Sequence, residues 1–191
     1  MFDEVNRAVD GYLSKWQALV AARKNKEFFE RLRPTAIGWK VADVAEHDRL
    51  VSEWRNSCDQ IIAVWLNDRW ITKMHLKDQK LNGNIEIIKV MQLRPGSSDA
   101  LGLDHLDFLD MEETNTIAIL AEEADIKSTA EENGLSHWTS IWFDGTEAKL
   151  RQGTVLDVII AELHETNDKI RGQKFATSWG ESAHAQISEV E

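Results

Sequence analysis

The chain has 191 residues, of which 42% are hydrophobic and 29% charged, and this fits a globular protein of one domain or of two small halves fused into one core. No apolar run approaches the ~20 residues that a membrane span needs, and the first four residues lack the basic start of a signal peptide. A single cysteine, Cys58, excludes an internal disulfide and fits a reducing compartment, so we expect a cytoplasmic protein that does not bind membranes.

The negative charge is concentrated towards the C-terminal end. The net charge is −11, and residues 101–191 carry nineteen acidic and six basic side chains, whereas residues 34–100 carry nine of each. Because such a surface repels phosphate backbones, we expect no nucleic-acid partner.

The N-terminal stretch, residues 1–33, has the periodicity of an amphipathic helix. Apolar residues recur every three or four positions at Phe2, Val5, Val9, Tyr12, Trp16 and Leu19. The helix is expected over residues 3–32, with an interruption near Asn25 and a stop at Pro34. Its apolar stripe needs a partner, either the rest of the chain or a second copy in a homodimer, and we favour packing within the chain.

The pattern of residues 34–100 predicts a strand, a helix and three further strands. Asp43 and Glu46 form a capping box that begins the helix. The strands are expected over residues 35–42, 60–66, 69–76 and 85–93, with a hairpin turn at Asn67-Asp68.

Residues 101–152 repeat this order, although few residues are identical. A strand over 103–110 and a helix over 112–123 precede strands over 126–129, 137–143 and 146–151, the last two joined by the hairpin dipeptide Asp144-Gly145. A C-terminal helix is expected over 153–171 and a disordered tail over 172–191. The predicted fold class is α+β, with two βαβββ modules that form a curved, cup-shaped mixed sheet between the two added helices.

Two successive βαβββ modules resemble the vicinal oxygen chelate superfamily, which includes glyoxalase I, extradiol dioxygenases and antibiotic-resistance proteins. The flanking helices are most similar to those of its YecM-like branch. The resemblance implies an open cup with four metal-ligand positions, usually His or Glu, on the first and last strands of each module.

Two of these four positions carry residues that can bind a metal. Leu103-Asp104-His105-Leu106 is similar to the family pattern at the start of the second module and places His105 at one position. Asn84-Ile85-Glu86-Ile87 matches the pattern in the last strand of the first module and places Glu86 at another.

The other two positions depart from the family pattern. The first-strand position falls on Ala36 or Gly38, and the last position falls on Lys149, with Glu147 two residues earlier on the same face. A catalytic divalent site needs about three protein ligands, so His105 and Glu86 alone would hold Zn, Ni, Mn or Fe weakly. We therefore expect a degenerate metal site and no certain cofactor. Two alternatives stay open: Glu147 completes the ligand set, or Lys149 pairs with Glu86 in place of the metal.

Further candidates share the polar faces of these strands. His105 is the best candidate for a catalytic group, as a general base oriented by Asp107. Strand alternation places Asp104 opposite Asp107, so Asp104 is expected to be a solvated or pocket residue. The predicted ligand-binding set is Lys40, Asp107, Trp142, Glu147, Lys149 and Arg151.

Three functions follow from these features. The favoured one is the binding of a small anionic or oxygen-rich molecule in the cup. The alternatives are a divalent-metal-dependent lyase, isomerase or dioxygenase, and an interaction protein that dimerises through its N-terminal helix or captures a basic partner with its acidic half. The sequence does not name the ligand and does not decide whether the protein is an enzyme.

Overall fold

The computed structural model describes residues 2–65, 69–78, 80–110, 116–123, 126–132, 137–151, 174–179 and 186–189. Two helices come first, α1 (Asp3–Ala21) and α2 (Lys26–Arg31), so the expected N-terminal helix is interrupted around Asn25 as predicted. None of the helices in these ranges combines the length and the apolar character that crossing a bilayer requires.

The first module has the predicted order of one strand, one helix and three strands. Its elements are β1 (Arg33–Val41), α3 (Val44–Trp54), the short 3-10 turn η1 (Arg55–Ser57), β2 (Cys58–Trp65), β3 (Trp70–Leu76) and β4 (Ile87–Gln92). The Asp43 side chain accepts a hydrogen bond from the backbone N–H of Glu46 at 2.9 Å and so caps α3. Glu46 itself pairs with Arg49 instead of returning to Asp43, so one half of the expected capping box forms.

The second module repeats this order. Its elements are β5 (Gly102–Leu109), α4 (Thr116–Ala121), β6 (Lys127–Glu132), β7 (His137–Phe143) and β8 (Thr146–Arg151). Asp144 and Gly145 both have positive φ, 43° and 71°, which is the backbone that a two-residue hairpin of this type needs. The expected helix over 112–123 is shorter, and residues 111–115 lie outside the described part.

The C-terminal predictions have a mixed outcome. The expected helix over 153–171 lies outside the described residues. Within 172–191, where a disordered tail was expected, the structure differs: β9 (Lys174–Trp179) pairs with β2, and β10 (Gln186–Glu189) pairs with β9. The remaining residues of that range are not described.

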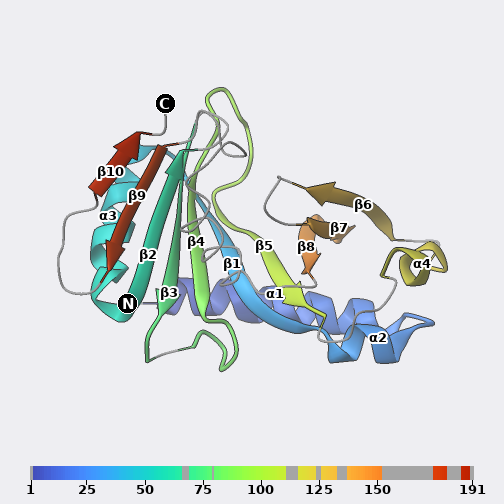
Figure 1. Ribbon diagram of the computed structural model, residues 1–191. Coiled ribbons are helices and arrows are strands. Elements are labelled where there is room, and N and C mark those ends of the chain that lie inside the picture. Colours follow the sequence, from blue (N-terminus) through green and yellow to red (C-terminus); the bar gives the residue numbers. More distant parts are fainter. Residues whose placement is uncertain are drawn as a thin grey trace.

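The described strands form one mixed sheet in the order β10-β9-β2-β3-β4-β1-β5-β8-β7-β6. Each module uses the same internal pairing, because β1 is parallel to β4 and β5 is parallel to β8. The two modules join through the antiparallel pair of β1 and β5, so the first strand of each lies at the centre of the sheet. Figure 1 shows the sheet curving between β2–β4 on one side and β6–β8 on the other. This architecture confirms the predicted fold class.

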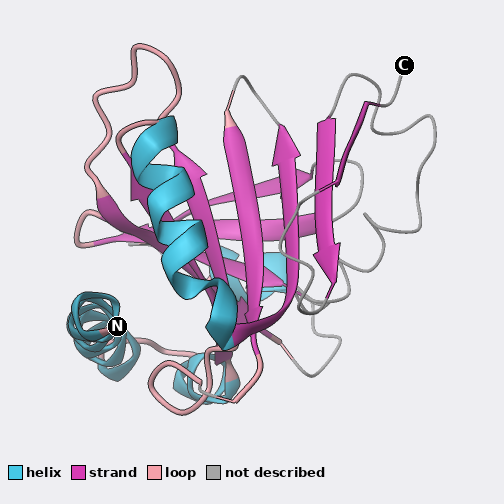
Figure 2. Ribbon diagram, turned by 90° about the vertical axis from the view of Figure 1, so that its left-hand side faces the viewer, coloured by secondary structure: helices cyan, strands magenta, loops and turns pink. Residues whose placement is uncertain are grey.

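The helices cover the outer side of the curve, which we call the back face. Trp16 of α1 stacks on Phe108 of β5 with 4.2 Å between ring centroids, and the Tyr12 hydroxyl donates to the carbonyl of Glu147 in β8 at 2.5 Å. Figure 2 shows α3 along the same sheet beside the first-module strands, where His47 and the Thr72 hydroxyl are 2.9 Å apart. The apolar stripe of α1 is thus buried within the chain, as favoured above. The opposite, concave side is the front face.

Candidate functional site

Five neighbouring strands place one row of side chains across the front face. By register, Lys89 of β4 lies beside Gly38 of β1, Gly38 beside His105 of β5, His105 beside Glu147 of β8, and Glu147 beside Trp142 of β7. Because side chains on a strand alternate between faces, the neighbouring residues of β5, such as Leu106, belong to the core at the back. The centre of the cup is therefore built by both modules.

Gly38 makes room for the imidazole of His105. A Cβ atom at position 38 would lie 2.4 Å from Cε1 and 2.7 Å from Nδ1 of His105, and 2.8 Å from Cε of Met91. No ordinary contact is that close, so the ring occupies the space that any other residue at position 38 would take. A glycine inside a strand often marks such a close approach.

Both ring nitrogens of His105 have partners, and the ring is 2% exposed. Nδ1 lies 2.8 Å from Oδ2 of Asp104, and Nε2 lies 2.7 Å from Nζ of Lys89. Because an ammonium can only donate, the consistent assignment is that Lys89 donates to Nε2 while Nδ1–H donates to Asp104. This fixes one neutral tautomer of His105.

Asp104 reaches the ring because β5 contains a bulge. Gly38 pairs with His105 and Trp39 with Leu103, so Asp104 is an additional residue with no partner of its own on β1. A bulge interrupts strict alternation and redirects a side chain. The expectation that Asp104 lies away from the His105 side was wrong for this reason.

Asp107, which is fully buried, accepts hydrogen bonds from two cations. Lys89 contacts Oδ2, and Nε of Arg151 donates to Oδ1 at 2.5 Å. Oδ2 is also 3.6 Å from Nε2 of His105, so the ammonium of Lys89 is shared by the imidazole and the carboxylate. Asp107 therefore helps to hold Lys89, whereas the carboxylate that orients His105 is Asp104.

Further charged and aromatic groups surround this centre. Lys40 binds Asp99 and Asp104, each at 2.7 Å, and so ties the far oxygen of Asp104. On the other side, Oε1 of Glu147 accepts from the Ser140 hydroxyl at 2.6 Å. Lys149 lies 3.9 Å from Glu147 and 5.1 Å from the ring centroid of Trp138, and Arg151 lies 5.0 Å from the same centroid. Nζ of Lys127 lies 5.1 Å from the ring centroid of Trp142.

The environment keeps the imidazole neutral. Burial lowers the pKa of His105 to about 3, and the positive charges of Lys89 and Lys149 act in the same direction. Burial likewise lowers the pKa of Lys89 to about 7, although the neighbouring Asp107 opposes that shift. Both effects have the same origin, because a charged group loses its hydration in the interior.

The two aspartates respond in the opposite way. Burial alone would raise the pKa of Asp107, but Lys89 and Arg151 outweigh it and hold that pKa well below the usual range. The same balance holds for Asp104, where His105 and Lys40 outweigh burial and lower the pKa of the carboxyl. Both carboxylates stay ionised at neutral pH.

The structure does not bring Glu86 to His105. Glu86 continues the ladder before β4, bonded through its backbone to Thr35 and Leu76, and its side chain pairs with exposed Lys80 at 3.1 Å. It lies opposite Leu76 on the ladder, a residue of the back-face core. The expected His105–Glu86 metal pair and the alternative Lys149–Glu86 ion pair are therefore not what the structure shows. Lys89, three residues further along, takes the place beside His105.

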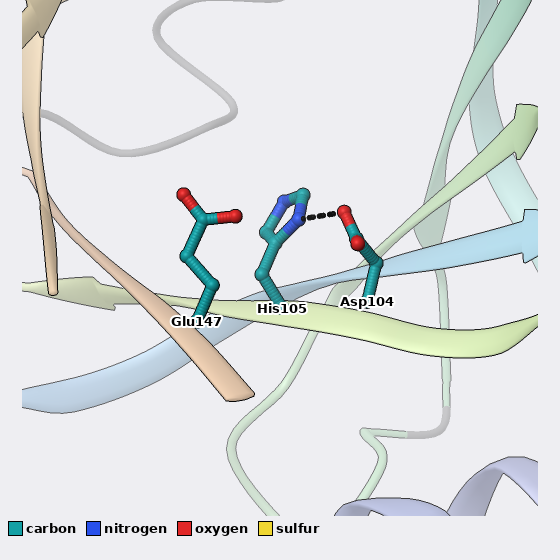
Figure 3. A group of neighbouring side chains, drawn as sticks. All are labelled: Asp104, His105 and Glu147. Atoms are coloured by element: carbon teal, nitrogen blue, oxygen red, sulfur yellow. Dashed lines mark hydrogen bonds and ion pairs between the residues drawn. The ribbon is translucent and has the colours of Figure 1, made fainter. Parts of the chain in front are cut away.

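Three groups that could hold a metal ion do lie together on the front face. Asp104, His105 and Glu147 each offer a ligand atom, and these atoms lie within 4.8 Å of one another. Figure 3 shows the two carboxylates on opposite sides of the imidazole ring, with Nδ1 bonded to Asp104. One imidazole and two carboxylates are ligands that divalent cations use.

The surroundings of this triad do not fit a divalent cation. Lys89 occupies Nε2 of His105, and Nδ1 carries the proton that Asp104 accepts. Lys40 and Ser140 already bind one oxygen each of Asp104 and Glu147. A divalent cation at one ring nitrogen would have to displace the hydrogen bond made there. At Nδ1, it would also have the buried ammonium of Lys89 on the opposite nitrogen.

Several solved structures are similar to this chain. A structural-genomics protein, EC4020, matches with a TM-score of 0.58 and 16% identity over 84% of this chain and 93% of its own. Methylmalonyl-CoA epimerase from Mycobacterium tuberculosis matches with a TM-score of 0.45 and 15% identity over 62% and 86%. The hypothetical protein BH1468 from Bacillus halodurans C-125 matches with a TM-score of 0.43 and 11% identity over 63% and 93%.

The likeness is one of fold. At 16% identity, the match to EC4020 covers most of both chains and shows a shared architecture. No protein-family model matches this chain, and no curated protein does. What the front face does therefore has to be argued from its own residues.

Proposed function

We propose that the front face binds a small anionic or oxygen-rich molecule and that it does so without a metal ion. The observation that carries this proposal is the gathering of three cationic side chains around Asp107. This one carboxylate accepts from Lys89 and Arg151 at once, and Lys149 stands on the neighbouring strand at the paired position. An anionic ligand would balance these cations through charge-assisted hydrogen bonds.

The remaining residues give such a ligand a shaped surface. Trp138 and Trp142 are half-buried on the face that carries Lys149 and Arg151, and their rings already contact cations. A planar or oxygen-rich molecule could stack on indole while its oxygens meet the basic groups. His105, the catalytic candidate from sequence, has both ring nitrogens engaged by Asp104 and Lys89, so its role in such a site is to position Lys89. We also propose that the chain is most similar to the YecM-like branch of the vicinal oxygen chelate superfamily, because helices α1 and α2 precede the first module and pack at the back of the sheet.

A thermal-shift screen tests the proposal. We expect mono- and dicarboxylates or phosphorylated metabolites to raise the unfolding temperature of the native chain, and the Lys149→Glu variant to lose that rise because its charge is reversed. Lys24→Glu is the matched control, since Lys24 is exposed in the turn after α1. A rise that survives in Lys149→Glu but not in Lys24→Glu would place binding elsewhere and refute the proposal, as would a screen in which no anion stabilises the chain.

A metal-dependent lyase, isomerase or dioxygenase is the second candidate, and the triad of Asp104, His105 and Glu147 is the observation in its favour. Elemental analysis of the purified chain separates the two candidates. One bound divalent ion per chain that is lost in His105→Gln would favour the enzyme, whereas a metal-free chain that still responds to anions supports the binding site proposed here.

A further inference from the structure

We infer that the ammonium of Lys89 stands where a divalent cation would bind His105 and Asp107, and that this one side chain keeps the front face free of metal. The inference concerns what the site excludes and does not depend on which ligand it binds. It also differs from the triad of Asp104, His105 and Glu147, because it involves Asp107.

The two acceptor atoms are spaced like ligands of one metal ion. Nε2 of His105 and Oδ2 of Asp107 are 3.6 Å apart, and both contact the nitrogen of Lys89. In a tetrahedral metal site with ligand bonds of about 2 Å, two donor atoms lie about 3.3 Å apart. The pair is thus already spaced like two ligands of one ion, with an ammonium at the point that the ion would occupy.

Both acceptors are held in place by further contacts. Nδ1–H of His105 donates to Asp104, which is the kind of outer contact that orients a metal-ligating imidazole. The other oxygen of Asp107 is held by Arg151. Glu147, at the strand position beside His105, places a further carboxylate on the same face. Around Lys89 the chain therefore presents two oriented acceptor atoms, and the ammonium occupies the point between them.

The cation and its two acceptors come from different modules. Lys89 comes from the last strand of the first module, while both acceptors lie on β5 of the second. It lies on a fully buried strand and is itself 5% exposed. The cationic group at this point is therefore part of the folded chain and does not depend on metal supply.

Cobalt titration tests the inference, because Co²⁺ bound by nitrogen and oxygen ligands absorbs visible light. We expect the native chain to take up no Co²⁺ at this site, and Lys89→Met to gain one ion per chain. The gain should disappear in the double variant Lys89→Met/His105→Gln. Lys89→Arg, which keeps a cation at the same position, is the matched control and should stay metal-free.

Several results would overturn the inference. One is a native chain that binds one Co²⁺, with loss of that ion in His105→Gln. Another is a folded Lys89→Met chain, shown by cooperative thermal unfolding, that gains no ion. Should Lys89→Met not fold, Lys89→Gln and the native titration still decide the matter. The outcome is separate from the anion screen, since Lys149→Glu leaves Lys89 in place.

Discussion

The two modules have the same strand order, but they contribute to the front face in different ways. The second module supplies His105, Asp107 and the acidic and basic residues of β8, whereas the first supplies the space at Gly38 and the cations Lys40 and Lys89. Neither module has a complete site, because His105 of the second module needs the space at Gly38 and the ammonium of Lys89, and both of these come from the first. A repeated scaffold therefore does not require a repeated site, because residues that face each other across the β1–β5 pair can differ in their chemistry.

The largest effect is expected from removing the buried carboxylate. Asp107→Ala leaves Lys89 and Arg151 without their shared acceptor inside the protein, and breaking a buried ion pair in this way costs about 3–5 kcal/mol. Urea unfolding followed by tryptophan fluorescence measures the loss. The first-module control is Glu86→Gln, which removes the solvent-facing pair with Lys80 and should cost about 1 kcal/mol or less. Equal losses would remove the energetic distinction between the two regions.

A smaller loss is expected when the space in the first module is filled. Gly38→Ala should destabilise the chain by about 1–3 kcal/mol, because its Cβ would lie 2.4 Å from the His105 ring and force the ring to move. The control is Gly11→Ala in α1, where nothing lies within 4 Å and the change should stabilise the helix by about 0.5–1 kcal/mol. Thermal unfolding of the two variants measures the expected loss of stability in one and the expected gain in the other. A neutral Gly38→Ala would show that His105 does not depend on the gap.

The smallest effect concerns the part of the first module that does not touch the site. Asp43→Ala removes the cap of α3 and should cost about 1 kcal/mol, most of which Asp43→Ser should restore. Histidine NMR signals should keep the chemical shifts of His105 in both variants, because α3 lies on the back face. A shift at His105 would mean that the capped helix and the front face are coupled.

Much of the fold could be predicted from sequence because the signals were local. The Asp43 cap, the Asp144-Gly145 turn and the alternating strand of β8 each depend on a few adjacent residues. The pairing of β1 with β5 was not predicted, because it joins strands that are far apart in the sequence. The strands β9 and β10 were missed because their small and polar residues give no strong pattern.

The site was predicted less well, for two physical reasons. Every residue of β4 is buried, so its apolar run has no alternation to show which residues face the front, and Glu86 was chosen where Lys89 belongs. The bulge in β5 then moved Asp104 to the His105 side, which alternation cannot foresee. A lysine inside a run of Ile, Val and Met was the signal that could have identified Lys89.

The most direct test of the account is an NMR titration of the His105 ring nitrogens, assigned with His105→Gln. Burial and the charges of Lys89 and Lys149 lower the pKa of His105 to about 3, so its ring should stay neutral from pH 8 to pH 5. Below pH 7, where Lys89 is mostly charged, the ring proton should be on Nδ1. An ordinary histidine has a pKa of about 6.5, so it would become protonated within that pH range. A His105 that becomes protonated near pH 6.5, or that carries its proton on Nε2, would contradict the placement of the Lys89 ammonium beside it.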